Sequence, residues 1–336
     1  MKKRFNVAVV GATGLVGTEM CRILEARDFP VAQFVPVASE RSTGKDVLFQ
    51  GKKVQVRALN EGVFEGIDLA LFSAGAGPSR TYAPIAAAAG ALVVDNSSAW
   101  RTHPEVPLCV PEVNIDQAQM RPLGIVANPN CATIQLVMAL KPLHDAAKLT
   151  RVVVSTYQSI SGAGAAAMES LRKQLTQLAR GEEVERGSLP GILAGNLLMS
   201  WKPDATTGYQ EEELKIIHET RRILRLPELA VSATTVRVPV ISSHSEAVTL
   251  ETERPLTASE ARAILSKMPG IEVVDDFEAG RYPQPIDAVG RDEVFVGRIR
   301  ADLGKAGGLQ MWIVSDNLRK GAALNAVQIA ERLLLA

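Results

Sequence analysis

Short apolar runs alternate with helical patterns through the first 130 residues of the chain. Five runs of strand length predict buried strands, at residues 5–10, 34–38, 68–72, 92–95 and 124–127. Met20, Ile23 and Leu24 recur at helical spacing after the first run, and an alanine-rich stretch over residues 79–89 predicts a second helix. This alternation predicts a Rossmann-like, doubly wound parallel α/β sheet, with ligands at the carboxyl ends of its strands. Residues 47–56, with a glycine between two short apolar runs, predict an inserted hairpin.

The pattern changes after residue 130. Helical spacing predicts helices from residue 131 onward and over 165–178, 211–224 and 318–335. Shorter apolar or alternating stretches predict strands at 152–154, 230–238, 245–250, 293–300 and 309–314. The second half is therefore predicted to be an α+β domain with a mixed or antiparallel sheet. We expect a first domain over residues 1–130, completed by a C-terminal helix over 317–336, and a second domain over 131–316.

Three glycines directly follow the first predicted strand and open the first predicted helix. Gly11, Gly14 and Gly17 allow a dinucleotide pyrophosphate to approach the backbone, with the helix N-terminus directed at it. The spacing GxxGxxG is looser than GxGxxG, and a plain tight turn between strand and helix is the alternative.

The loop after the second strand carries two cations and three hydroxyl groups. Residues 39–45 include Ser39, Arg41 and Ser42, which suit the 2'-phosphate of NADP. Glu40 argues for an unphosphorylated ribose, and a solvated surface loop would have a similar composition. We expect NADP as the cofactor.

Cys131 follows Asn128, Pro129 and Asn130 at the start of a predicted helix. Unpaired main-chain N–H groups and the positive end of the helix dipole there favour the thiolate, which is the nucleophilic form. The same N–H groups could hold an oxyanion. The alternative is a cysteine that serves only as a small buried hydrophobe.

Composition narrows the classes of function. The 336 residues carry no net charge, with 37 Lys and Arg against 37 Asp and Glu, so charge favours neither a nucleic-acid nor a membrane partner. Three widely spaced cysteines argue against a disulfide framework or a cysteine-rich metal site, and suit a reducing cytoplasm; no metal is expected. The basic start at residues 2–4 reaches Gly11 too soon for a secretion signal.

A thiolate nucleophile needs a partner that handles protons, and the chain has four histidines. His103, His144 and His218 suit structural or solvated positions, whereas His244 is expected in a polar turn between two strands. Cysteine and histidine alone would also permit a cysteine hydrolase. A dinucleotide domain that ends at the cysteine favours an enzyme-bound thioester that is reduced, or formed, by hydride transfer.

Such a site needs cations for phosphate and a separate anchor for the substrate. Arg101, Lys215 and Arg237 are the candidates. Arg101 leaves the carboxyl end of a predicted strand, although a surface salt bridge would explain it equally well. Glu212 and Lys215 lie one turn apart on a predicted helix, where an ordinary ion pair is the favoured interpretation.

Several stretches together resemble the aspartate-semialdehyde dehydrogenase family from about residue 5 to the C-terminus. Besides the glycine-rich start they are NPNCATIQ, NSSAWR, STYQSISGAG, VRVPVISSHSE and SDNLRKGAALNAVQIAE, in the family's order. The resemblance implies that Cys131 is the acyl-forming nucleophile and His244 the acid/base. It also implies that the second domain is the catalytic and dimerisation domain.

The remaining roles also follow from the resemblance. It implies that Arg237 binds the substrate carboxylate, that Glu212 meets its amino group and that Gln158 contacts it. Arg101 and Lys215 are expected to bind phosphate, and Asn130 is grouped with them. Cofactor contacts are expected from Gly11, Thr13, Gly14, Leu15, Val16, Ser39, Arg41, Ser42, Ser161, Gly162 and Asn317. Ala132 departs from the Ser or Thr that usually follows the cysteine, and the segment around residues 188–200 is atypical.

The expected reaction is NADPH-dependent reduction of L-aspartyl-4-phosphate to L-aspartate 4-semialdehyde, with release of phosphate, on the route to lysine, methionine and threonine. The expected assembly is a homodimer or homotetramer. An N-acetyl-γ-glutamyl-phosphate reductase is the nearest alternative, and Glu212 argues against it because an N-acetyl group needs no acidic partner. A catalytically silent paralogue that acts as a binding protein is the other alternative, although Cys131 and His244 are both retained.

Overall fold

The computed structural model describes residues 3–199 and 201–335, and the chain divides into two compact units. The first unit comprises residues 1–129 and 322–336, and the second comprises residues 130–321. Asn317 therefore falls in the second unit, whereas the sequence assigns it to the helix that completes the first domain. None of the helices among the described residues is both long and apolar enough to cross a bilayer.

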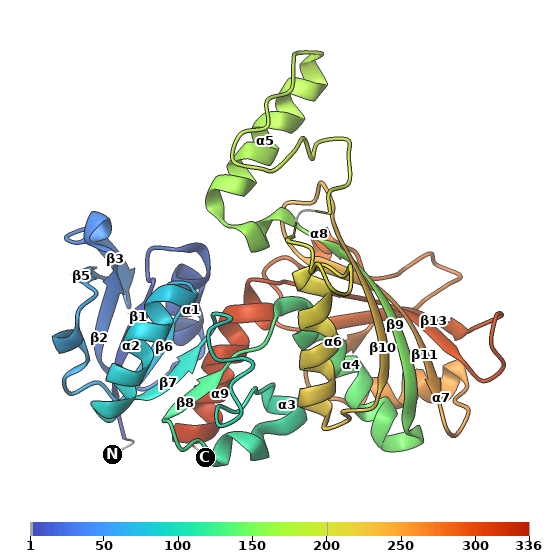
Figure 1. The fold of residues 1–336 in the computed structure, drawn as a ribbon, viewed down its shortest axis with the longest axis horizontal. Helices are drawn as coiled ribbons and strands as arrows, with labels where there is room; N and C mark the ends of the chain where they lie inside the picture. Colours follow the sequence, from blue (N-terminus) through green and yellow to red (C-terminus); the bar gives the residue numbers. More distant parts are fainter. Residues whose placement is uncertain (1–2, 200, 336) are drawn as a thin grey trace. The chain divides into compact units, whose positions relative to one another are not determined.

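A six-stranded parallel sheet forms the centre of the first unit, in the order β5-β2-β1-β6-β7-β8 (Figure 1). Its strands are β1 (Phe5–Val10), β2 (Val31–Ala38), β5 (Arg57–Ala58), β6 (Leu69–Phe72), β7 (Leu92–Asp95) and β8 (Ile125–Ala127). A separate antiparallel hairpin is formed by β3 (Asp46–Phe49) and β4 (Lys52–Gln55). The parallel doubly wound sheet and the inserted hairpin that the sequence predicts are both confirmed.

Helices cover both faces of this sheet because its strands are apolar on both sides. Helix α1 (Leu15–Ala26) packs with the C-terminal helix α9 (Leu324–Leu334) in one core, and α2 (Ala76–Ala88) packs against β7. The core cluster joins Val7, Val9 and Leu24 to Leu324 and Val327. The end of the chain thus completes the fold of its beginning. The short helix α3 (Pro111–Asn114) lies between β7 and β8 in the chain.

A six-stranded mixed sheet forms the centre of the second unit, in the order β10-β9-β11-β14-β13-β12. Its strands are β9 (Leu149–Gln158), β10 (Ala230–Arg237), β11 (His244–Thr252), β12 (Ile271–Val273), β13 (Val294–Ala301) and β14 (Leu309–Ser315). The pairs β9/β10 and β12/β13 are parallel and the other three pairs are antiparallel. The predicted mixed sheet is confirmed, and β12 and β5 are additions that are too short to give a clear pattern in the sequence.

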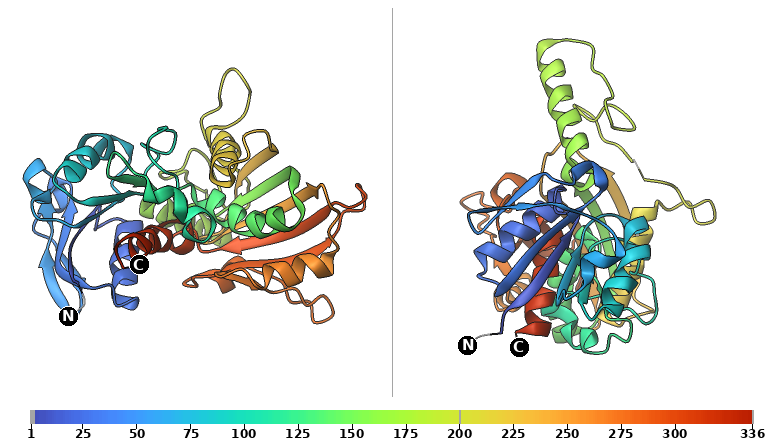
Figure 2. Two further views of the ribbon diagram at one scale, coloured as in Figure 1. Left: turned by 90° about the horizontal axis from the view of Figure 1, so that it is seen from below. Right: turned by 90° about the vertical axis from the view of Figure 1, so that its left-hand side faces the viewer.

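Helix α4 (Cys131–Ala147) packs against four strands of this sheet, with α6 (Glu211–Leu224) and α7 (Ala258–Leu265) beside it. The inward residues of β11 are His244, Glu246, Val248 and Leu250, which alternate along the strand. Helix α5 (Ala165–Arg180) and the segment after it form a small core of their own, and α5 leads away from the strands of its unit (Figures 1 and 2). The short helix α8 is Pro285–Ala288.

The last predicted helix, over residues 318–335, is not regular throughout. Residues Arg319–Ala323 form a π-helical turn, and only Leu324–Leu334 is α-helical. Wider turns of this kind are frequent at functional sites, and this one includes Gly321, whose packing against Cys131 is described below.

Candidate active site

The turn after β1 is built from glycines that pack too closely for any side chain. Gly11 has a φ of +91°, and a Cβ atom built on it would lie 2.4 Å from the Ser73 carbonyl oxygen. A Cβ atom on Gly17 would lie 2.1 Å from the Gly11 carbonyl oxygen. Helix α1 then begins at Leu15 without a side-chain cap, and its first turn, which lies within the described residues, contains no acidic residue. Uncapped N–H groups at a helix start fit the pyrophosphate of a dinucleotide.

The proposed 2'-phosphate loop forms a short 3-10 turn over Glu40–Ser42 directly after β2. Thr13 Oγ1 donates to Ser42 Oγ at 3.5 Å, which brings the turn beside the glycine loop. Arg41 and Ser39 are exposed there, as is Glu40. This contact places cofactor residues expected after β1 beside cofactor residues expected after β2.

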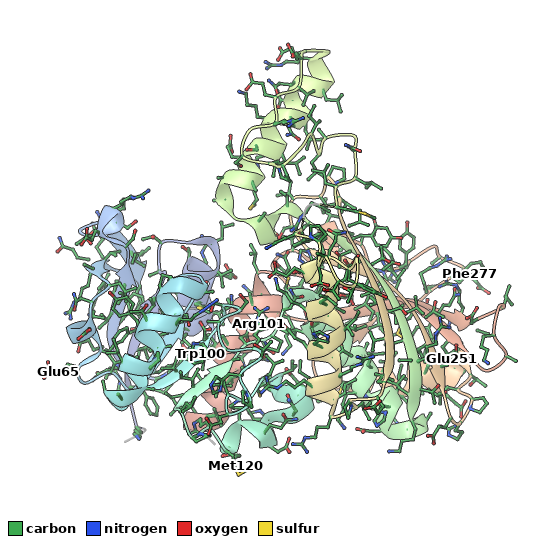
Figure 3. The ribbon with its side chains drawn as sticks, viewed as in Figure 1. Glu65, Trp100, Arg101, Met120, Glu251 and Phe277 are labelled. Atoms are coloured by element: carbon green, nitrogen blue, oxygen red, sulfur yellow. The ribbon has the colours of Figure 1, made fainter. Side chains whose placement is uncertain are left out.

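Arg101 is held in the loop that follows β7, where Figure 3 labels it next to Trp100. Its Nε donates to the Asn128 carbonyl oxygen at 2.9 Å and its Nη2 to the Asn96 carbonyl oxygen at 3.0 Å. The Asn128 amide also donates to Asn96 Oδ1 at 2.6 Å, so side chains tie together the loop ends that carry Arg101. Arg101 is therefore fixed at the carboxyl edge of the parallel sheet.

Cys131 is the first residue of α4, as the sequence predicts, and Asn130 is the residue that caps the helix. Asn130 Oδ1 accepts hydrogen bonds from the N–H groups of Ala132 at 2.9 Å and Thr133 at 3.3 Å. The prediction of unpaired N–H groups at this helix start is therefore wrong for these two residues, because an asparagine side chain satisfies them.

The side-chain Nδ2 and the main-chain N–H of Asn130 link α4 to α6. Its Nδ2 donates to Glu212 Oε1 at 2.7 Å, and its main-chain N–H donates to Glu219 Oε2 at 2.6 Å. Glu212 Oε1 also accepts from Gln158 Nε2 at 3.1 Å, and Lys215 Nζ lies 3.5 Å from Glu212 Oε2. The expected Glu212–Lys215 ion pair is present, but Glu212 is buried among residues of the predicted site and does not lie on an open helix surface.

His244 is fully buried as the first residue of β11, so the prediction of a polar turn is wrong. The preceding Ser243, at φ +72°, donates its N–H to Asn317 Oδ1 at 3.0 Å, which folds the polar stretch inward. His244 Nδ1 accepts from the Ser159 N–H at 3.0 Å, and its Nε2 has no partner among the described residues. Burial, with a further contribution from Arg237, lowers the pKa of His244 to about 3.

Arg237 lies at the end of β10 and is also buried. Its Nη1 donates to the Ser159 carbonyl oxygen at 2.7 Å, and its guanidinium lies 4.5 Å from the centre of the Trp201 ring. Burial lowers the pKa of Arg237, while the negative charges of Cys131 and Glu212 raise it. A Cβ atom on Gly162 would lie 3.5 Å from Arg237 Nη1 and 3.6 Å from His244 Nε2. Both nitrogen atoms therefore face the space above Gly162.

Asn317 lies between the serine residues around His244 and Gly321, which packs against Cys131. Its Oδ1 accepts from the hydroxyl groups of Ser159 at 3.1 Å and Ser161 at 2.9 Å, besides the Ser243 N–H. Gly321 follows one turn later, and a Cβ atom on it would lie only 3.0 Å from Cys131 Cβ. Cys131, His244, Arg237, Gln158, Glu212, Lys215, Ser161, Gly162 and Asn317 thus gather within the second unit.

Several residues of this cluster are missing from the sequence-based prediction. Ser159 lies in the predicted glycine-rich turn, so its neighbours give a weak signal for it. Trp201 falls in the stretch without any period, and Gly321 lies in a predicted helix. Glu219 also lies within a helix, where it looks like an ordinary surface acid. Only the packing of α6 against α4 reveals its role.

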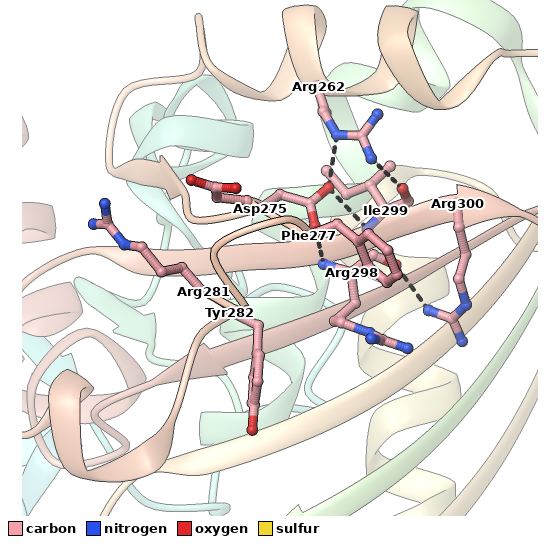
Figure 4. A pocket seen from close by; sticks show the side chains of 10 residues that line it. Arg262, Asp275, Phe277, Arg281, Tyr282, Arg298, Ile299 and Arg300 are labelled. Atoms are coloured by element: carbon pink, nitrogen blue, oxygen red, sulfur yellow. Dashed lines mark hydrogen bonds and ion pairs between the residues drawn. The ribbon is translucent and has the colours of Figure 1, made fainter.

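A separate cavity of about 370 Å³ lies beside β13 in the second unit, and none of the predicted site residues lines it (Figure 4). Asp275 accepts from Arg262 Nε at 2.6 Å and from the N–H groups of Arg298 and Ile299, and so holds the irregular part of β13. Phe277 and Tyr282 border it as exposed aromatic side chains. These contacts account for the shape of the strand and give no reason to place chemistry there.

The chain is similar to known proteins over nearly its whole length. Residues 6–120 match the family model described as semialdehyde dehydrogenase, NAD binding domain, and residues 140–320 match semialdehyde dehydrogenase, dimerisation domain. The aspartate-semialdehyde dehydrogenase of Aquifex aeolicus is 51% identical over 333 residues, which cover 98% of each chain. The chain belongs to the aspartate-semialdehyde dehydrogenase family. The enzyme of Legionella pneumophila is 49% identical over 98% of this chain and 96% of its own.

Solved structures of aspartate-semialdehyde dehydrogenases share the fold. The crystal structure of aspartate semialdehyde dehydrogenase II from Vibrio cholerae is 44% identical, with a TM-score of 0.96 over 99% of both chains. A structure of that protein in complex with ASA gives the same TM-score at 43% identity. The chain is an oxidoreductase with aspartate-semialdehyde dehydrogenase activity in the biosynthesis of aspartate-family amino acids. Its first unit contains a nicotinamide-dinucleotide-binding domain and its second a dimerisation domain.

Proposed function

We propose that the chain reduces L-aspartyl-4-phosphate to L-aspartate 4-semialdehyde with NADPH, through a thioester on Cys131, and that His244 is the second catalytic residue. The observation that carries this proposal is the position of Cys131 at the start of α4, in the same cluster as two buried nitrogen groups, His244 Nε2 and the Arg237 guanidinium. We assign the first unit to the cofactor and the second to catalysis.

The chemistry follows from the groups in this cluster. The Cys131 thiolate attacks the acyl carbon, a carbon–sulfur bond forms, and the bond from that carbon to the phosphate oxygen breaks as phosphate leaves. When bound, NADPH supplies the hydride that reduces the thioester carbon. The carbon–sulfur bond then breaks, the electron pair returns to sulfur, and the aldehyde is released. The positive end of the α4 dipole and the charge of Arg237 both favour the sulfur anion in this cycle.

The substrate anchors are proposed from charge and position. Arg237 binds the α-carboxylate with guanidinium nitrogen atoms other than Nη1, which bonds the Ser159 carbonyl oxygen. Glu212 binds the amino group, and Gln158, which bonds Glu212, contacts the substrate. An acidic partner favours a free amine over an N-acetyl group, and this supports aspartyl phosphate over the longer acylated substrate. The ASA complex of the Vibrio cholerae relative also supports it.

Arg101 and Lys215 are proposed to bind the phosphate. Lys215 is partly exposed and forms ion pairs with Glu211 at 3.0 Å and Glu212 at 3.5 Å, so a phosphate would compete with two carboxylates for it. We propose a different role for Asn130, because both ends of its side chain are bonded within the protein. It positions α4 and Glu212 in place of binding phosphate.

We propose NADP as the preferred cofactor. Arg41 and Ser42 in the exposed turn after β2 suit the 2'-phosphate, and the glycine loop suits the pyrophosphate. Arg41→Ala should weaken NADP binding at least tenfold and leave NAD binding nearly unchanged, as measured by titration calorimetry. Equal weakening of both cofactors would contradict the assignment.

A homodimer, or a tetramer built from dimers, is the proposed assembly. The face of the second sheet away from α4 carries Tyr157, whose ring centre is 5.3 Å from that of Trp312. Helix α5 exposes Leu178, and the segment after it exposes Leu197 and Met199. Exposed apolar surface of this kind suits a subunit contact. Light scattering should give at least twice the mass of one chain, and a monomeric mass would contradict the proposal.

One assay tests the reaction. The purified protein is incubated with aspartate semialdehyde, phosphate and NADP, and the absorbance of reduced cofactor is followed. Cys131→Ala should abolish turnover and leave NADP binding intact. Turnover with N-acetylglutamate semialdehyde but not with aspartate semialdehyde would favour the alternative substrate, and turnover by Cys131→Ala would remove the cysteine as nucleophile.

A further inference from the structure

Arg237 is a buried cation without an acidic partner. Only 7% of its surface is exposed, and no carboxylate in the described part of the chain lies within ion-pair distance of its guanidinium. Glu212 acts on its charge, but the Glu212 carboxylate is bonded to other groups, on Asn130, Gln158 and Lys215. A buried charge is costly unless other groups stabilise it. The guanidinium therefore depends on neighbours that are not acids.

The Trp201 ring and the Ser159 carbonyl oxygen are those neighbours. The guanidinium carbon of Arg237 lies over the Trp201 ring, 4.5 Å from its centre, which is well within the range of a cation–π contact. Nη1 donates to the Ser159 carbonyl oxygen at 2.7 Å. An aromatic face attracts a cation without carrying a charge of its own. The guanidinium therefore keeps its full attraction for an anion, whereas a carboxylate neighbour would compete with an anionic ligand.

Main-chain contacts fix the position of Trp201. Three residues earlier, Leu198 and Arg237 form an antiparallel bridge, in which the Leu198 N–H donates at 3.0 Å and the Arg237 N–H donates at 2.8 Å. The Trp201 N–H donates to Gln210 Oε1 at 3.3 Å. Gln210 is the residue that caps α6. The chain that carries Trp201 is thus attached both to the end of β10 and to the start of α6.

These two attachment points carry the proposed substrate anchors. Arg237 is the last residue of β10, and Glu212 is the second residue of α6. The two elements are also joined directly, because the Thr235 N–H donates to Glu213 Oε1 at 2.9 Å. Trp201 therefore lies where the carboxylate anchor and the amine anchor come together, and its ring covers the first of them.

We propose that Trp201 is a positioning residue for substrate recognition, whose ring holds the Arg237 guanidinium from one face so that its remaining N–H groups are directed at the substrate carboxylate. This inference rests on the proposed role of Arg237 and adds a residue that acts through it. Trp201 contributes to substrate affinity and not to bond making or breaking. Its effect is therefore expected in KM and not in kcat.

Three variants of the full-length protein test the role of the aromatic face. Trp201→Leu keeps an apolar side chain without a ring, and Trp201→Phe keeps a ring. We expect Trp201→Leu to raise KM for aspartate semialdehyde by about tenfold or more, and Trp201→Phe by no more than about threefold, with kcat and KM for NADP within about threefold in both. Trp201→Met serves the same comparison if Trp201→Leu is not folded by circular dichroism. The same KM with and without a ring at this position would overturn the proposal.

A double-mutant cycle tests whether Trp201 acts through Arg237. We expect Trp201→Leu to lower kcat/KM by about tenfold in the unmodified protein but by less than about twofold in Arg237→Ala, because residues that act through one contact are not additive. The slope of rate against low concentrations of aspartate semialdehyde gives kcat/KM even where affinity is weak. An equal loss in both backgrounds would show that Trp201 acts independently of Arg237.

Two outcomes separate this inference from the function on which it rests. An unchanged kcat/KM in Arg237→Ala alone would refute the proposed carboxylate anchor. A large loss in Arg237→Ala, with no effect of Trp201→Leu, would refute only the role of Trp201. Thr206→Ala is the control for a change in the same connection to α6, since its side chain is exposed, and KM should stay within about twofold.

Discussion

Gly321 illustrates how a single residue can matter through the space that it leaves empty. It packs its Cα side against Cys131, and a Cβ atom would lie 3.0 Å from Cys131 Cβ and 3.4 Å from Cys131 Cα. A methyl group here must push the nucleophile, because the surrounding helix turns are buried. Catalysis depends on such positions to well below 1 Å.

Gly321→Ala should therefore reduce kcat by about tenfold or more while the protein stays folded, since a displacement of tenths of an ångström misplaces the sulfur. Steady-state kinetics with aspartate semialdehyde would measure this. Gly77→Ala is the matched control, because a Cβ atom on this helical glycine meets nothing within 4 Å in the described structure. Equal kcat for the two variants would contradict the positional argument.

Glu246 is a second residue whose importance lies in its surroundings. It is fully buried on β11, two residues after His244 on the same face, and neither carboxyl oxygen has a hydrogen-bond partner among the described residues. Burial raises the pKa of Glu246 well above its usual value, and the Gln135 side chain opposes this. Glu246 is thus neutral in the folded protein at pH values where the unfolded chain ionises it.

This difference sets the sign of a pH effect. Above about pH 4.5 the unfolded state releases the Glu246 proton and the folded state keeps it, so the folded protein loses stability as the pH rises. Glu246→Gln should remove that loss. Its advantage in free energy of unfolding should grow from pH 5 to pH 8 by as much as about 1.4 kcal/mol per unit. Urea denaturation at several pH values would measure it.

The control for Glu246→Gln is Glu251→Gln on the same strand. Glu251, labelled in Figure 3, is partly exposed, and its Oε1 lies 3.2 Å from Arg151 Nη1. Its substitution should therefore change stability by no more than about 0.5 kcal/mol at any of these pH values. The same pH slope for both variants would show that Glu246 ionises in the folded state.

At the scale of elements, the residue that caps α4 both stabilises the helix and positions groups of the proposed active site. Asn130 caps the helix with Oδ1 and donates from Nδ2 to Glu212, so one side chain fixes both the nucleophile and a proposed substrate anchor. The helix is buried along nearly its whole first half, from Ala132 to Leu140. Water therefore cannot replace the Asn130 side chain as the hydrogen-bond partner of the first N–H groups of the helix.

Asn130→Asp should test this arrangement. The new carboxylate keeps the cap acceptor but opposes Glu212 Oε1 at the present 2.7 Å contact and adds to the charge of Glu219. We expect a loss of about 1–3 kcal/mol in the free energy of unfolding, with reduced affinity for aspartate semialdehyde. Asn130→Ser keeps an accepting oxygen without the added charge and should cost less. Greater stability of the Asp variant would contradict the paired roles.

At the scale of the whole molecule, the chain order and the folded units do not coincide. The first unit takes residues 1–129 and returns to use residues 322–336, with Ala323, Leu324, Ala326, Val327 and Ile329 in its core. The cofactor unit therefore cannot finish folding until the last residues of the chain are present. The catalytic unit is an insertion within it.

Val327→Asp should disrupt the first unit specifically. A carboxylate placed at a fully buried position without a partner costs several kcal/mol, so NADP binding should be lost by calorimetry. Arg332→Asp introduces the same side chain on the exposed side of α9 and should leave NADP binding within about twofold. Retention of NADP binding in Val327→Asp would show that α9 is not needed by the cofactor unit.

The local pattern of apolar and polar residues was sufficient to predict much of this fold. Apolar runs and helical spacing determined the alternation of the first sheet, the mixed sheet of the second unit and the place of Cys131 at a helix start, because each depends on neighbours within a few residues. Tertiary structure decided what the polar residues do. It buried His244, which its polar neighbours suggested was in an open turn, and it joined Asn130 Nδ2 to Glu212 Oε1, 82 residues away in the chain. It also brought the Ser159 main-chain N–H to His244 Nδ1, 85 residues away in the chain. These outcomes depend on contacts between distant segments, in which a polar side chain is satisfied by whichever partner the fold brings to it, and no local pattern carries that information.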